Sequence, residues 1–265
     1  MRAVVELLFL PALIGYGEAA VAYAGDAWHP GRAGRLATWG VRLGWLAQTA
    51  LIAALFASSG GFPWDTWAGT LNLFVWLVVG GYLVWGCRAR YALLGLAIMP
   101  LAAGLLLASW LAGAGSSGNS VAYSTPFLVF HVGLVLAAFA GLTLAAAMSG
   151  LYLYEERRLK RRRPASLLGR MPSLVTLDTL AARTVLVSLP ALATGVGLGL
   201  VRLREAGGGF DALMAASLAT IAVYAAYLVL RLEAGWRGRR AAYLALAGFA
   251  LVIVVRLALP LAHFA

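Results

Sequence analysis

Residues 126–163 read PFLVFHVGLVLAAFAGLTLAAAMSGLYLYEERRLKRRR. From Pro126 to Tyr154 this stretch contains no aspartate, glutamate, lysine or arginine, and a dense series of basic residues then closes it. A membrane-spanning helix needs about 20 apolar residues to cross a hydrocarbon core of about 30 Å. A helix from Pro126 to Glu155 would exceed that thickness. We therefore expect one long span that tilts in the membrane or projects from it, and we expect the extra length at its outer end.

Similar apolar runs fill the rest of the chain. Of the 265 residues, 62% are hydrophobic and only 12% are charged, and the mean hydropathy is +0.86. A soluble domain of this length would be about half apolar and a quarter charged. The composition predicts an all-α, polytopic membrane bundle of about eight transmembrane helices, forming a single membrane domain over 1–265. The expected spans are 3–24, 39–58, 68–87, 91–112, 126–154, 184–203, 211–231 and 240–263.

The loops between these runs alternate between basic and almost uncharged. Because lysine and arginine concentrate in cytoplasmic loops, this alternation places both termini on the outer side of a cytoplasmic-type membrane. The first run is expected to be a retained span rather than a removed signal. Most of the basic residues behind the net charge of +11 sit in short loop blocks, so we attribute the charge to orientation and contact with anionic lipids, and we exclude nucleic acid as a partner. The basic blocks are Arg32 and Arg35, Arg88 and Arg90, Arg157 to Arg170, and Arg231 to Arg240.

The segment 155–183 is the largest cytoplasmic piece. Pro164 and Pro172 interrupt it, and Ser173 can cap a following helix. The apolar residues up to Leu180 predict a short helix lying on the membrane surface. The basic run in this segment is interpreted as an orientation signal, and docking of a cytoplasmic partner is the alternative.

Histidines are the residues with the clearest potential for chemistry. His131 near the outer end of the fifth run and His263 at the outer end of the eighth lie at similar depth on the same side. Two imidazoles facing each other can supply both axial ligands of a haem iron. The alternative is two interfacial histidines with ordinary hydrogen bonds. The sole cysteine, Cys87, excludes an intrachain disulfide.

Other residues near the outer side add to this hypothesis. Arg256 lies seven residues before His263, so the two share one helix face, and its guanidinium suits a haem propionate. An ion pair with Glu6 is the alternative. Trp64 and Trp67 are typical of the aromatic belt at a membrane surface, and they can also pack on a porphyrin.

Several segments resemble the cytochrome c assembly protein family, of the CcsA and HemX type, and eight spans with a C-terminal histidine fit the HemX-like branch. The resemblance implies haem held on the outer face between two external histidines, at the positions of His131 and His263. The family also has a tryptophan-rich segment that contains a Trp-Asp pair. The resemblance sets Asp211 at the position of that aspartate, but the segment from Glu205 to Asp211 contains no tryptophan. At the family's intramembrane histidine positions stand Gln48 and Val229. The segments are Phe130-His131-Val132, Leu151 to Lys160, Met171 to Leu180, Tyr224 to Arg231, Gly235 to Ala242, and Gly61-Phe62-Pro63.

The sequence therefore favours a membrane protein that binds haem b near the outer face and carries it rather than catalysing a reaction. The candidate ligands of the iron are His131 and His263, and the other cofactor-binding candidates are Arg256, Trp64, Trp67 and Asp211. The alternative is a cofactor-free regulatory or scaffolding subunit of a haem or cytochrome assembly complex. Its partner would be another assembly subunit, or a cytoplasmic protein at 155–183. A transporter ranks last, because the spans contain few ionisable residues.

Overall fold

The computed structural model describes residues 2–28, 33–59, 66–86, 92–113, 125–161, 172–205 and 212–258. Within these residues the chain is helical, with eight α-helices in the order expected from the apolar runs. They are α1 Arg2–Trp28, α2 Ala33–Ser59, α3 Trp67–Gly86, α4 Ala92–Leu111, α5 Thr125–Lys160, α6 Leu174–Glu205, α7 Ala212–Leu232 and α8 Arg239–Ala258.

The all-α, polytopic membrane fold predicted from composition is confirmed. Six of the described helices are long and apolar enough to cross a membrane, and α3 contributes a shorter apolar stretch, Ala68–Val84. Large apolar side chains such as Leu7, Val84 and Leu232 are exposed on the helices, as expected where lipid tails replace water as the solvent. The chain is therefore a multi-pass membrane protein.

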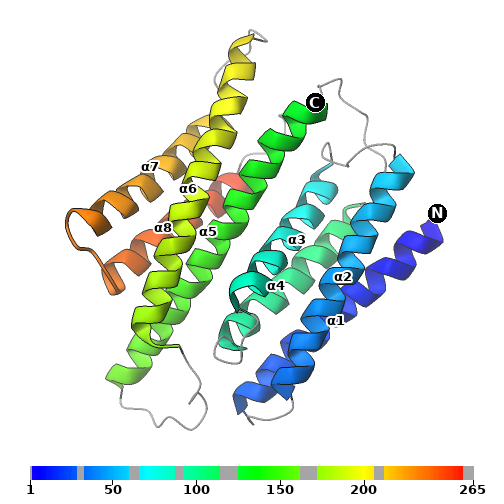
Figure 1. Ribbon diagram of the computed structural model, residues 1–265, viewed down its shortest axis with the longest axis horizontal. Helices are drawn as coiled ribbons and strands as arrows, with labels where there is room; N and C mark the ends of the chain where they lie inside the picture. Colours follow the sequence, from blue (N-terminus) through cyan, green and yellow to red (C-terminus); the bar gives the residue numbers. More distant parts are fainter. Residues whose placement is uncertain are drawn as a thin grey trace. The chain divides into compact units, whose positions relative to one another are not determined.

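The chain divides into two compact units, and each is described by itself. Residues 1–121 and 163–172 form the first unit, and residues 122–162 and 173–265 form the second. In the first, α1 packs on α2 and α4, and α3 packs on α2 and α4. In the second, α5 packs on α6 and α8, and α7 packs on α6 and α8. Each unit is thus a ring of four helices, with α1 beside α2 and α5 beside α6 in Figure 1. The single membrane domain expected from the sequence stays a prediction.

Small side chains allow the helices of the second unit to approach closely. Its core combines alanines with a few large residues, and Tyr224 is fully buried with its hydroxyl donating to the Ala245 carbonyl oxygen at 3.0 Å. Small residues at the contact are the usual means by which membrane helices pack, because lipid provides no hydrophobic driving force between them. The core residues are Ala138, Leu142, Ala145, Ala182, Val185, Leu192, Val196, Tyr224, Tyr227, Ala241 and Ala245.

The start of α6 differs from the sequence-based expectation. Ser173 does cap a helix, because its Oγ accepts a hydrogen bond from the Thr176 backbone N–H at 3.1 Å. The helix does not end near Leu180 as a short surface helix, however, but continues as α6 to Glu205. Arg183 is exposed while its neighbours Ala182 and Thr184 are buried, so the polar residue sits on the outer face without interrupting the helix. The predicted separate surface helix is therefore wrong.

The extra length of α5 also lies at an end that was not expected. The helix continues past Glu155 to Lys160 and so extends at its basic end. There Glu155 accepts from Arg158 at 3.3 Å, and Glu156 accepts from Lys160 at 2.6 Å. Pairs spaced three or four residues apart support the helix beyond its apolar part.

One carboxylate fixes the loop between α7 and α8. Asp178 in α6 accepts two hydrogen bonds from the Arg231 guanidinium, at 2.6 and 3.1 Å, and a third from the Gly238 backbone N–H at 2.8 Å. Gly235 and Gly238 both adopt φ +64°, a conformation that glycine accepts without strain. The loop is thereby held against the beginning of α6.

Candidate functional site

His131 lies in the second turn of α5 and is half-buried. Its ring Nδ1 is 2.7 Å from the carbonyl oxygen of Gly195 in α6. Phe127, one turn earlier in α5, stacks on the imidazole with ring centroids 5.9 Å apart and an interplanar angle of 3°. The imidazole is therefore held on two sides, by a hydrogen bond and by a parallel aromatic ring.

Two glycines of α6 allow α5 to approach closely beside His131, and Gly199 is the one that leaves room for the imidazole. A Cβ at Gly199 would lie 2.6 Å from His131 Cε1, and a Cβ at Gly195 would lie 2.7 Å from Val135 Cγ2. Gly195 and Gly199, here called the glycine pair, are spaced four residues apart and so share one face of α6. Our sequence analysis missed them. Small residues at this spacing within a span are the signal that identifies them.

The protonation of the ring follows from its partner. A backbone carbonyl can only accept a hydrogen bond, so the Nδ1 of His131 carries the hydrogen and donates it to Gly195. In the neutral imidazole the lone pair then resides on Nε2. Histidines that bind metals in proteins commonly donate their second ring N–H to a carbonyl in this way, which fixes the ring and increases its basicity. The environment of His131 therefore suits it to ligate a metal through Nε2.

A guanidinium lies at the same end of α5 and α6. The Cζ of Arg202 is 5.5 Å from the centroid of the Phe127 ring, and Arg202 forms an ion pair with Glu205 at 2.8 Å. Both side chains of this pair are largely exposed. Arg202 thus places a positive charge near Phe127 and, through that ring, near His131.

The other predicted site residues are not described by the structure. His263, Trp64 and Asp211 lie outside the described residues, and Arg256 and Trp67 lie within α8 and α3 but their side chains are not described. The proximity of His131 and His263 therefore stays a prediction, as does the choice between a propionate and Glu6 as the partner of Arg256. Over the described ranges, no three or more His, Cys, Asp or Glu side chains gather at a metal-binding distance.

Gln48 and Val229, the residues that the resemblance sets at intramembrane histidine positions, are both described by the structure. Gln48 is buried in the first unit, where its Oε1 accepts from the Tyr16 hydroxyl at 2.6 Å. Its Nε2 donates to Asn72 O at 3.0 Å and to Asn72 Oδ1 at 2.7 Å. These bonds link α1, α2 and α3. Val229 in α7 is 56% exposed on the second unit.

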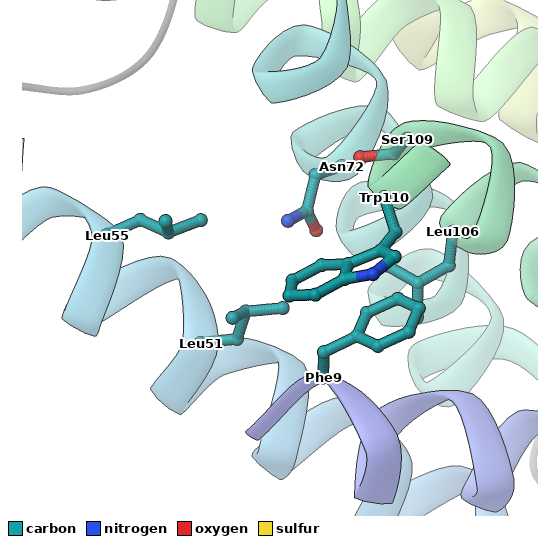
Figure 2. A pocket seen from close by; sticks show the side chains of 7 residues that line it. All are labelled: Phe9, Leu51, Leu55, Asn72, Leu106, Ser109 and Trp110. Atoms are coloured by element: carbon teal, nitrogen blue, oxygen red, sulfur yellow. The ribbon is translucent and has the colours of Figure 1, made fainter. Parts of the chain in front are cut away.

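The first unit also contains a narrow hollow between its helices. Figure 2 shows Asn72 pointing into it beside the Trp110 ring, with Leu51 and Leu55 of α2 opposite. The Trp110 ring stacks on Phe9 with centroids 4.2 Å apart. The hollow has no room for a water molecule, so it cannot hold a cofactor, and its largely apolar lining is typical of imperfect helix packing.

Comparison with known proteins shows which family and which relatives this chain is similar to. A family model described as "Cytochrome C assembly protein" matches residues 91–262. A cytochrome c biogenesis protein CcsA from Gloeothece citriformis is 26% identical over 85% of this chain and 84% of its own length. Another CcsA, from Crocosphaera subtropica, is 25% identical over 96% of this chain and 92% of its own. A protein HemX from Brevibacillus brevis is 29% identical over 59% of this chain and 58% of its own.

Proposed function

The chain belongs to the cytochrome c assembly protein family, and on this basis we propose that it binds haem b near the outer face of the cytoplasmic membrane through His131 and His263. The observation that carries the proposal is the 2.7 Å contact between His131 Nδ1 and the Gly195 carbonyl oxygen. It leaves Nε2 as the ring nitrogen that can ligate iron.

The second ligand is proposed from topology. α5 and α8 pack against one another in the second unit. α5 ends at Lys160 and α8 begins at Arg239, and both of these basic ends are expected on the cytoplasmic side. The opposite end of α5 carries His131, and His263 follows the described end of α8 by five residues. Two imidazoles on neighbouring helices at one membrane depth suit the axial positions of a single haem.

The remaining candidates would complete the site. Arg256 would pair with a propionate, for which a planar guanidinium is well suited. Trp64, Trp67 and Asp211 belong to segments that are expected on the outer side, and they stay further candidates for contact with the porphyrin. Bound haem would serve as cargo with a redox-active iron, and the residues named here would hold and orient it without catalysing a reaction.

Gln48 and Val229 restrict the proposal to the outer face. Neither side chain is a haem ligand, and the Gln48 amide is already bonded to Tyr16 and Asn72. The proposed role is therefore to hold haem outside for another component of cytochrome c assembly. A cofactor-free scaffolding subunit is the competing function, and it predicts no haem binding at all.

A haem titration of the purified full chain in mild detergent tests the proposal. The wild type should develop a Soret band that saturates at one haem per chain. A His131→Ala, His263→Ala double variant should lose that band while its helical content stays unchanged by circular dichroism. If haem fails to bind, or if the double variant binds it equally well, the proposal is wrong and the scaffolding function gains support.

A further inference from the structure

Two arginines converge on one tyrosine at the basic ends of α5 and α8. Arg157 Nη2 lies 3.4 Å from the Tyr243 hydroxyl, and Arg239 Nη2 lies 3.5 Å from the same oxygen. All three side chains are exposed. Both are long hydrogen bonds, and the Cζ of Arg239 also lies 5.4 Å from the Tyr243 ring centroid. A guanidinium has five N–H donors, so each arginine retains donors for a closer acceptor.

Among the residues that the structure describes, no carboxylate lies within ion-pair distance of Arg157 or Arg239, and Glu156 attracts Arg239 only at longer range. The acidic side chains near these helix ends are bound to other basic residues. Glu155 pairs with Arg158, Glu156 with Lys160, and Asp178 with Arg231. Two like charges that share one neutral acceptor at the surface repel each other, and an anion placed between them would remove that repulsion.

The position of Arg239 in the fold also favours a bound anion. It is the first residue of α8, and Arg240 follows it, while the first turn of that helix contains no acidic residue. The amino end of a helix carries a partial positive charge, so cations there are unfavourable and anions favourable. The backbone and the two guanidiniums therefore favour an anion at one location.

We propose that Arg157, Arg239 and Tyr243 form a binding site for the phosphate of an anionic lipid headgroup. Guanidiniums match phosphate oxygens in geometry as well as charge, and the Tyr243 hydroxyl supplies a further donor. Arg157 and Arg239 would thus hold one headgroup at a defined place, beyond the general contact with anionic lipids expected from the sequence.

A lipid fits this site better than a free phosphate because apolar surface continues from it. Tyr154 lies one turn before Arg157 on the same face of α5 and is 56% exposed. Arg240 follows Arg239 in α8, and its guanidinium lies 5.9 Å from the Trp236 ring centroid. Tryptophan is enriched at the headgroup level of membranes. A headgroup held by the arginines would lay its acyl chains along the exposed side of α5.

Lipid retention measured by native mass spectrometry of the full chain in detergent tests this site. Phosphatidylglycerol, phosphatidylcholine with the same acyl chains, and inorganic phosphate are supplied in separate titrations. The wild type should retain phosphatidylglycerol at least tenfold more strongly than phosphatidylcholine and should not exchange it for inorganic phosphate. An Arg157→Gln, Arg239→Gln double variant should lose this preference and keep its haem spectrum.

The matched control is an Arg161→Gln, Arg237→Gln double variant, which removes two exposed charges from the same end of the second unit. General attraction to anionic lipid depends on the number of charges lost and should therefore fall equally in both variants. The site predicts at least a tenfold greater loss in the first variant. Equal losses would overturn the proposal, as would equal retention of the two lipids by the wild type. Displacement of phosphatidylglycerol by inorganic phosphate would overturn the choice of a lipid.

Discussion

Replacing Gly199 by alanine tests the fit between α6 and His131 without touching a proposed ligand. The added Cβ would lie 2.6 Å from His131 Cε1, whereas ordinary contacts begin at 3.4 Å. The imidazole cannot yield freely, because Phe127 stacks on one of its faces and the Gly195 carbonyl oxygen holds Nδ1 at 2.7 Å. The ring must therefore shift away from α6, and its hydrogen bond must lengthen or break.

The expected magnitude follows from three opposing contributions. Overpacking costs about 1–3 kcal/mol, and loss of the hydrogen bond costs about 0.5–1.5 kcal/mol. Alanine recovers about 1 kcal/mol, because it favours a helix more than glycine does. The net destabilisation is therefore about 0.5–3.5 kcal/mol. Haem affinity should suffer more clearly, because loss of a hydrogen bond that orients a metal ligand typically weakens binding about 10–100-fold.

The assay is a haem titration followed by the Soret band, and Gly197→Ala is its matched control. A Cβ at Gly197 meets nothing within 4 Å, so this variant gains the same helix propensity without the clash. We expect at least tenfold weaker haem binding for Gly199→Ala and a change of less than about twofold for Gly197→Ala. Equal haem affinity and identical spectra for the two variants would refute the role assigned to the glycine pair.

The other predictions concern stability, measured by thermal unfolding in detergent. Asp178→Ala should destabilise the protein by about 3 kcal/mol, because it leaves the Arg231 guanidinium, which is 14% exposed, without its carboxylate. Glu205→Ala breaks an exposed ion pair and should cost less than about 1 kcal/mol. Equal losses of stability in the two variants would contradict the greater weight given to the Asp178–Arg231 pair. Ser173→Ala should cost about 1 kcal/mol by removing the N-cap of α6, and an unchanged melting temperature would show that the cap contributes nothing. Gln48→Leu should cost about 1–3 kcal/mol by leaving its buried partners unsatisfied yet keep the haem spectrum, and loss of that spectrum would place the haem site in the first unit.

Most of the fold could be predicted because membrane helices are encoded by local composition. The run from Pro126 to Tyr154 indicated α5 by itself, and the other seven helices of the described residues followed from similar runs. Helix ends were harder to predict. Nothing in the local pattern distinguishes a polar residue that ends a span from one that lies on the exposed face of a continuing helix, and Arg183 is of the second kind.

The candidate site could be predicted only in part, for a different physical reason. His131 was identified because a histidine in an apolar run is rare. The carbonyl that orients it and the glycine pair that admits it belong to α6, more than 60 residues later in the chain. Such contacts depend on the register between two helices, which composition does not determine. The same holds for Arg157, Arg239 and Tyr243, whose convergence depends on the packing of α5 against α8.

The most direct test of the proposed haem site is the electron paramagnetic resonance spectrum of the ferric, haem-loaded protein. Two imidazoles on one iron predict a low-spin signal in the wild type. His131→Ala and His263→Ala, each made singly, should both convert it to the high-spin signal of a five-coordinate haem. A wild type that is already high-spin, or a single variant that stays low-spin, would contradict the shared ligation of one haem by His131 and His263.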